Sequence, residues 1–136
     1  MSPGRNMHTR FLMSFSALVL AALGVGMTFL PQELLLHVGA RSAGMPVLLI
    51  QLLGALYLGF AMLNWMSRGS HMGGIYGRPI SMANFLHFAV AALALVRGAI
   101  DQPFAPEVTA LAAVYSAFGI WFGLVLFIHP ADGTRT

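Results

Sequence analysis

Residues 11–30 read FLMSFSALVLAALGVGMTFL, and this stretch is the strongest indication of the fold class. Its polar interruptions are Ser14, Ser16 and Thr28. A bilayer core about 30 Å thick needs about 20 apolar residues in a helix that rises 1.5 Å per residue. The stretch is therefore predicted to cross a membrane as an α-helix. We expect it to be retained, because its apolar part exceeds the about 7–15 residues of a signal peptide and no clear cleavage site precedes Pro31.

Three further stretches have the same apolar character, and loops rich in proline, glycine and charge separate them. Such residues prevent one helix from running into the next. No segment alternates as a strand would, and a closed barrel needs more strands than this chain could supply. The sequence predicts an all-α integral membrane protein, a four-helix bundle that forms a single domain over residues 1–136. The expected spans are about 11–30, 45–66, 81–97 and 108–128.

Composition excludes several classes of function. Hydrophobic residues make up 58% of the chain and charged residues 8%, against about 25% charged in soluble domains. The absence of cysteine excludes disulfide scaffolds, thiolate metal sites and redox chemistry on a cysteine pair. The net charge of +3 comes from arginines near the ends of the spans and not from a basic cluster, so we expect no binding of nucleic acid.

The distribution of arginine predicts the orientation, because cytoplasmic loops of membrane proteins carry an excess of Lys and Arg. Five arginines fall on the side of the termini and the middle loop: Arg5, Arg10, Arg68, Arg78 and Arg135. Arg41 and Arg97 fall on the other side. Both termini are therefore predicted to be cytoplasmic. Because arginine without lysine is typical of a GC-rich bacterial genome, we expect the membrane to be a bacterial cytoplasmic membrane.

Polar side chains inside a span are informative, because they must be satisfied away from water. Tyr57, Asn64 and Arg68 share one face of the second span. Ser81, Asn84 and His87 share a face of the third, which a short loop should pack antiparallel to the second.

Two interpretations of these residues stay open. They could form a pocket that opens to the cytoplasmic leaflet and holds an anionic headgroup or the polar end of a lipophilic ligand. Alternatively, Asn64, Asn84 and His87 could hydrogen-bond one another and hold the two helices together, at about 0.6 kcal/mol per bond. The candidate ligand-binding residues are Tyr57, Asn64, Arg68, Arg78, Asn84 and His87.

Small residues four positions apart predict where helices approach closely. Such pairs occur in the first, second and fourth spans: Ala22 and Gly26, Ala55 and Gly59, Gly119 and Gly123. These positions would build the bundle or an interface with another protein, and spacing alone does not separate the two.

Signals for catalysis are missing from the sequence. No acidic residue lies within a span, which argues against proton-coupled transport. No cluster of histidine and acidic residues predicts a zinc site, and no nucleophile has a base and an orienting carboxylate beside it. We expect no metal, no catalytic residue and no resident cofactor, with a bound quinone or lipid left open.

Two short stretches carry a resemblance to a known family: FLPQEL at residues 29–34, closing the first span, and GALYLGF at residues 54–60. With the hydropathy pattern of the whole chain, they resemble the small bacterial four-helix membrane proteins that include DoxX-like proteins. Some of those proteins are linked to quinone or thiosulfate chemistry as subunits of membrane oxidoreductases. The resemblance implies that any redox role here would need a partner or a bound cofactor, because the chain has no cysteine.

Three functional hypotheses follow. The leading one is a non-catalytic membrane protein, either an accessory subunit of a larger membrane complex or a binder of a lipid- or quinone-like molecule. The alternative is a DoxX-like redox module or enzyme that acts on a lipophilic substrate, and a further alternative is an oligomeric pore. The expected partners are membrane lipids and either a larger complex or further copies of the chain.

Overall fold

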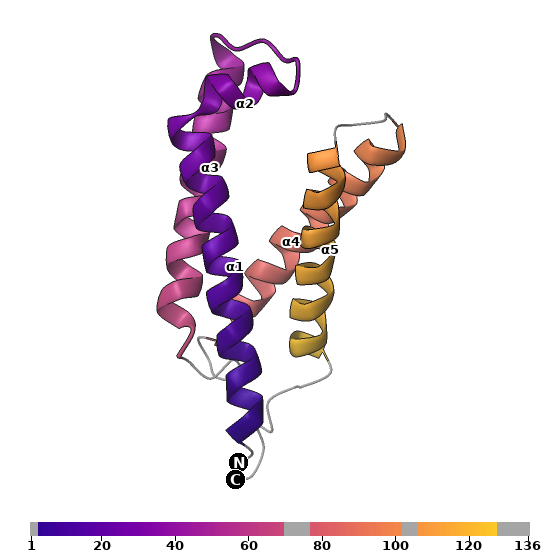
Figure 1. Ribbon diagram of the computed structural model, residues 1–136. Coiled ribbons are helices and arrows are strands. Elements are labelled where there is room, and N and C mark those ends of the chain that lie inside the picture. Colours follow the sequence, from indigo (N-terminus) through magenta and orange to yellow (C-terminus); the bar gives the residue numbers. More distant parts are fainter. Residues whose placement is uncertain (1–2, 70–76, 102–105, 128–136) are drawn as a thin grey trace. The chain divides into compact units, whose positions relative to one another are not determined.

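The computed structural model describes residues 3–69, 77–101 and 106–127, and these residues are almost entirely helical (Figure 1). No strand occurs in those three ranges. The all-α prediction is therefore confirmed. The helices are α1 (Pro3–Phe29), α2 (Pro31–His37), α3 (Met45–Ser67), α4 (Gly77–Asp101) and α5 (Pro106–Phe127).

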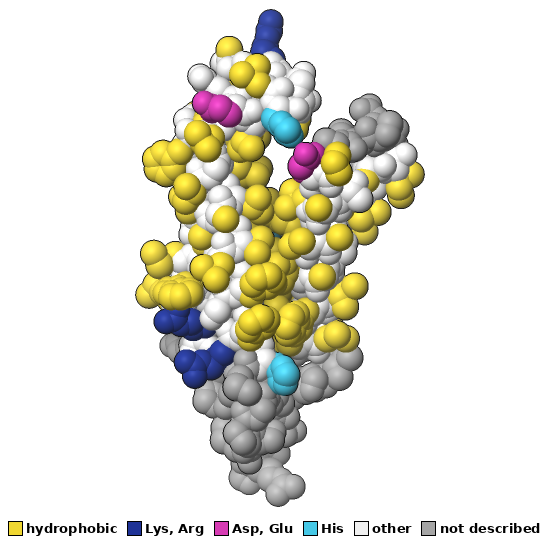
Figure 2. All heavy atoms as spheres, in the orientation of Figure 1, with side chains coloured by type: hydrophobic (Ala, Val, Ile, Leu, Met, Phe, Trp, Pro, Cys, Tyr) yellow, Lys and Arg dark blue, Asp and Glu magenta, His cyan; other side chains and the backbone are white. Residues whose placement is uncertain are grey.

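Four of these helices are long and apolar enough to cross a membrane: His8–Phe29 of α1, Met45–Ser67, Gly77–Ile100 and Pro106–Phe127. Their surfaces are covered with hydrophobic side chains, whereas charged side chains lie near helix ends (Figure 2). Apolar surface on this scale is rare on proteins that face water. The chain is thus a membrane protein with four candidate spans, as the hydropathy predicted.

The third span begins earlier than the sequence predicted. We expected Arg78 and Pro79 to belong to the preceding loop, but α4 starts at Gly77 and includes both residues. The first turn of a helix tolerates proline, because the N–H groups there have no partner within the helix. The loop residues before Gly77, among them His71 and Tyr76, lie outside the described residues.

The helix α2 was not predicted, because Pro31 was interpreted only as the end of the first span. Pro31 occupies the first helical position, where its fixed φ suits the helix. A glycine turn ends α2: Gly39 has φ +69°, and the N–H groups of Gly39 and Ala40 donate to the carbonyls of Leu36 and Leu35 at 3.0 and 2.8 Å. This is a Schellman motif, which closes the C-terminal end of α2.

The chain divides into two compact units. Residues 10–69 form one, called the α1–α3 unit, and residues 1–9 with 70–136 form the other, called the α4–α5 unit. The single four-helix domain expected over residues 1–136 stays a prediction.

Within the α1–α3 unit, α1 and α3 lie side by side and antiparallel, and α2 turns away from the axis of α1 (Figure 1). They approach each other closely at Gly24 and Gly54. A Cβ built on Gly54 would lie 3.0 Å from the carbonyl oxygen of Gly24 and 2.8 Å from the backbone nitrogen of Thr28. Only glycine allows two helix backbones to come this close.

Within the α4–α5 unit, the two antiparallel helices meet through aromatic rings. Phe88 on α4 lies at the centre and is fully buried. Its ring centroid is 5.2 Å from that of Tyr115, 4.8 Å from that of Phe118 and 5.7 Å from that of Phe122, all on α5. Offset and edge-to-face ring pairs at these separations are favourable beyond the area they bury.

Candidate functional site

An open apolar groove of about 610 Å³ runs along the α4–α5 unit. This volume falls within the range of about 300–1,000 Å³ that is usual for sites of small-molecule ligands. Its lining residues come from both helices: Phe85, Ala89, Ala92, Leu93 and Val96 from α4, and Ser116, Gly119, Ile120, Gly123, Leu124 and Phe127 from α5.

Small residues of α4 and α5 meet along the groove. A Cβ added to Gly119 would lie 3.4 Å from the backbone of Ala89, and one added to Gly123 would lie 3.1 Å from the Phe85 ring. Larger side chains stand beside these positions, and Phe85 and Phe127 form an edge-to-face pair at 5.5 Å between centroids. Small residues therefore form the floor and large apolar residues form the walls.

The aromatic cluster around Phe88 lies in the same interface between α4 and α5, beside the groove. Phe88 and Ala89 are consecutive in α4, so their side chains leave the helix about 100° apart. Large rings fill the interface in the direction of Phe88, whereas the small residues Ala89, Ala92, Gly119 and Gly123 leave space on the neighbouring side. The groove is a consequence of this unequal distribution of side-chain volume.

The groove is apolar along its whole length except for one hydroxyl, that of Ser116. Ser116 lies ten residues into α5, about 15 Å from the start of the helix and hence near the middle of the span. A ligand with a polar group along its length would find few partners here. The lining therefore suits a hydrocarbon or isoprenoid chain.

Arg78 stands on the α4 face that lines the groove. It precedes Phe85 by seven residues, two helical turns, so the two side chains differ by only about 20° around the helix axis. Arg78 is exposed and lies roughly 10 Å beyond Phe85 along the axis. An apolar groove with a cation past one end matches an amphipathic molecule with an anionic head and an apolar tail.

The structure places the predicted polar residues of the second span in the α1–α3 unit. Tyr57 and Asn64 are buried. The Asn64 amide donates a 3.0 Å hydrogen bond to the Ser16 hydroxyl on α1, and that hydroxyl donates to the carbonyl of Met13 at 3.1 Å. Asn64 thus joins α3 to α1. Its partner, Ser16, was not predicted from the sequence.

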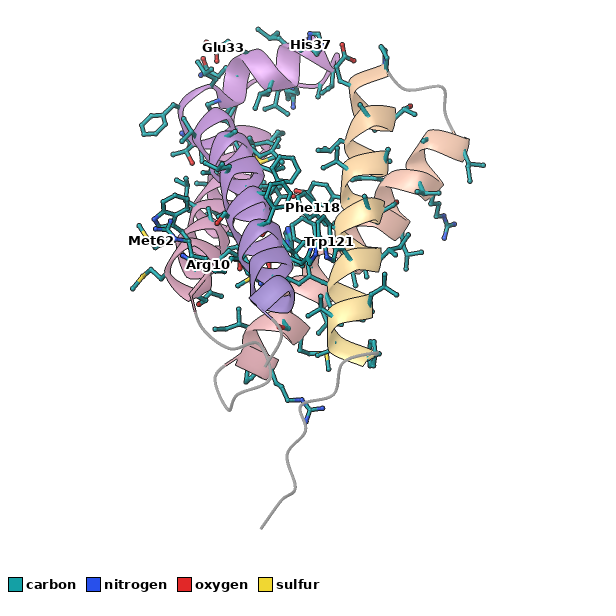
Figure 3. All side chains as sticks on the ribbon, turned by 60° about the horizontal axis from the view of Figure 1, so that its bottom comes forward. Arg10, Glu33, His37, Met62, Phe118 and Trp121 are labelled. Atoms are coloured by element: carbon teal, nitrogen blue, oxygen red, sulfur yellow. The ribbon has the colours of Figure 1, made fainter. Side chains whose placement is uncertain are left out.

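Arg68 follows α3 as its C-cap and lies over the ring of Trp65, with 3.6 Å between the guanidinium carbon and the ring centroid. This is a cation–π contact within one turn of helix. Together with Arg10, which Figure 3 shows near the start of α1, it makes this end of the α1–α3 unit basic. Glu33 and His37 lie at the opposite end, on α2 (Figure 3).

The predicted polar residues of the third span lie on α4. Ser81 and Asn84 are buried and donate to backbone carbonyls one turn earlier, Ser81 to Gly77 and Asn84 to Ile80, both at 2.9 Å. The His87 ring packs against rings of its own unit, 5.1 Å from the Phe88 centroid and 5.9 Å from the Tyr115 centroid. The polar pocket predicted from Tyr57, Asn64, Arg68, Arg78, Asn84 and His87 combines residues of both units and stays a prediction.

The predicted small-residue positions have different surroundings. Gly119 and Gly123 lie against α4, as the groove floor shows. Gly26 and Gly59 have no described atom within 4 Å of an added Cβ, and Ala22 and Ala55 are exposed. The contact between α1 and α3 uses Gly24 and Gly54 instead, because the antiparallel register brings these two backbones together. A place for Gly26 and Gly59 in an interface with another protein stays a prediction.

Among the described residues, no group of three or more His, Cys, Asp or Glu side chains could hold a metal ion.

These features define a class: a small helical membrane protein with an apolar groove in one of its two units. In comparisons with known proteins, no family model, no curated protein and no solved structure matches the chain.

Proposed function

We propose that the protein binds a lipid-like amphipathic molecule, with the apolar tail in the α4–α5 groove and an anionic head at Arg78. The observation that carries this proposal is the groove itself, about 610 Å³ of apolar space floored by small residues. In a membrane, such a groove opens to hydrocarbon, so an acyl or isoprenoid chain reaches it without crossing water.

The position of Arg78 supports an anionic head. An arginine near the membrane surface contributes about 1 kcal/mol to the attraction of anionic lipid. Its guanidinium can also form paired hydrogen bonds to a phosphate. Arg78 is exposed at the start of α4, where the span begins, and the groove starts two turns further along.

The arginine distribution supports a bacterial cytoplasmic membrane with both termini in the cytoplasm. Arg10 and Arg68 belong to one end of the α1–α3 unit, whereas Glu33 and Arg41 belong to the other. With that orientation, Arg78 would lie at the cytoplasmic surface, where anionic lipids create a negative potential. We propose that the bound lipid belongs to this leaflet.

Native mass spectrometry of the protein released from nanodiscs, with identification of the bound lipids, tests this proposal. We expect the wild type to keep one anionic lipid-like molecule. Replacing Ser116 by Leu should fill the groove and lower occupancy about tenfold, the equivalent of about 1.4 kcal/mol. Ala117→Leu is the matched control, because Ala117 is the next residue, is exposed and does not line the groove.

The headgroup has its own test. Arg78→Gln should lower the preference for anionic over neutral lipid about fivefold, which corresponds to about 1 kcal/mol. Arg41→Gln, an exposed arginine in the other unit, should leave the preference unchanged. Equal occupancy in Ser116→Leu, Ala117→Leu and wild type would show that the groove is not the binding site.

The same experiment addresses the other hypotheses. A bound quinone in place of a lipid would favour the redox alternative that the DoxX-like resemblance suggests. Co-purification of larger subunits in fixed proportion would favour the accessory-subunit hypothesis. Ion flux through liposomes that contain only this protein would favour the pore.

A further inference from the structure

The α4–α5 groove extends beyond the middle of the membrane. On α4 its lining runs from Phe85 to Val96, and Arg78 precedes this stretch near the start of the helix. Val96 follows Arg78 by 18 residues, roughly 27 Å along the helix axis. The midplane of a hydrocarbon core of about 30 Å lies only about 15 Å from its surface. Even a tilt of about 40° would leave Val96 at a depth of about 20 Å. A chain that starts at Arg78 must therefore pass the midplane to fill the groove.

The groove has the width of one hydrocarbon chain. Its α4 lining covers roughly 16 Å of helix, so a volume of about 610 Å³ corresponds to a mean cross-section of roughly 38 Å². An extended chain advances about 1.2 Å per carbon, and a methylene group has about the volume of a water molecule, about 30 Å³. One chain thus has a cross-section of about 25 Å² and two chains have about 50 Å². The groove accepts one chain and is too narrow for two.

We infer that the groove selects a single chain of about 20 carbons, an inference that rests on the proposed lipid function. The distance from Arg78 to Val96 corresponds to about 22 carbons of an extended chain, and the anionic head takes up the first few Å. A shorter chain leaves the far end of the groove unfilled, so the lining atoms there lose contacts. The ligand class is thus an anionic amphiphile with one long chain, longer than a single leaflet is deep.

Ser116 marks a level inside the groove. A Cβ added to Gly119 would contact the backbone of Ala89, which sets the antiparallel register of the two helices. Ser116 precedes Gly119 by three residues and is therefore level with about Ala92, roughly 6 Å short of Val96. A leucine at position 116 would close this last part of the groove, which holds about five carbons.

Native mass spectrometry with straight-chain alkyl phosphates measures the preferred length. Phosphates with chains of about 12, 16, 20 and 24 carbons are offered one at a time in nanodiscs of neutral phosphatidylcholine, so that only the chain varies. Occupancy of the wild type should rise about tenfold from the shortest chain to the chain of about 20 carbons, a factor that roughly ten additional atom contacts would supply. It should not rise further for the longest chain. A phosphate with two chains of about 20 carbons should bind no more tightly than the single-chain compound.

Ser116→Leu should shift the preferred chain to about 16 carbons and leave binding of the shortest chain unchanged. Ala117→Leu, at the exposed neighbouring position outside the groove, should keep the preference of the wild type. A further rise at the longest chain, or tighter binding of the two-chain phosphate, would overturn the inferred length or width.

The same data separate this inference from the proposed function. Equal occupancy of all chain lengths in the wild type, with lower occupancy in Ser116→Leu, would overturn length selection and keep the groove as the lipid site. Equal occupancy of every chain in the wild type and in both variants would contradict the proposed function itself.

Discussion

The two units join two antiparallel helices in different ways. In the α1–α3 unit, backbones meet at Gly24 and Gly54, and a hydrogen bond from Asn64 to Ser16 adds a polar link. In the α4–α5 unit, aromatic rings around Phe88 hold the helices, and small residues meet on the adjacent side. Lipid supplies no hydrophobic force between helices, so each contact depends on packing and polar bonds.

The difference explains why a groove forms in one unit. Aromatic rings fill one side of the helix contact, whereas on the neighbouring side the small residues Ala89, Ala92, Gly119 and Gly123 form the floor of the groove. The helix pair α4 and α5 thus provides both the aromatic contacts that stabilise the unit and the space that could hold a ligand. Substitutions that weaken one contact and leave the other intact test this difference between the units.

The largest effect is expected for Phe88→Ala. Phe88 forms ring pairs with three residues of α5, and such pairs contribute about 0.5–1.5 kcal/mol each, so the loss should be about 2–4 kcal/mol. Denaturant titration in mixed micelles, followed by the fluorescence of Trp121, would measure it. Leu86→Ala, at an exposed position on the same helix, is the control and should have little effect.

A smaller loss is expected for Gly54→Ala. The added methyl would lie 2.8 Å from the backbone nitrogen of Thr28, so α1 and α3 must move apart, at a cost of about 1–3 kcal/mol. Gly26→Ala adds the same methyl where no described atom lies within 4 Å. It should instead stabilise the helix slightly, because alanine has the higher helix propensity. Equal stability of the two variants would contradict the close contact at Gly54.

The smallest effect is expected for the hydrogen bond between Asn64 and Ser16. A double-mutant cycle with Ser16→Ala and Asn64→Leu isolates the energy of this pair. We expect a coupling of about 0.6 kcal/mol and no more than about 1.7 kcal/mol, as for other interhelical hydrogen bonds in membranes. Additive single effects would mean that the two side chains do not support each other.

Hydropathy alone was enough to predict the four spans, because their length and apolar character follow directly from the thickness of a bilayer. Helix α2 was missed, because a proline that ends one helix can also begin the next. Asn64 was recognised as a buried polar residue, but its partner Ser16 lies 48 residues away, and only the register of α1 against α3 brings the two together.

The close contact and the groove both depend on how two helices pack, which spacing within one helix does not predict. Spacing within one helix pointed to Gly26 and Gly59, whereas the contact at Gly24 and Gly54 depends on which residues of two helices face each other. The groove depends on how side-chain volume is distributed around a helix contact, which no single segment encodes. Arg78 was identified from its charge and position, and its alignment with Phe85 became clear only once α4 was known to start at Gly77.

Photoreactive lipid cross-linking can show directly whether a lipid binds in the groove of the α4–α5 unit. An anionic lipid with a diazirine in its acyl chain would be cross-linked in membranes, and the labelled peptides would be identified by mass spectrometry. We predict labelling of residues 85–96 and 116–127 that an excess of unlabelled anionic lipid competes away, and only uncompeted labelling of α1 and α3. Uniform, uncompeted labelling of all four spans would contradict a specific lipid site in the α4–α5 unit.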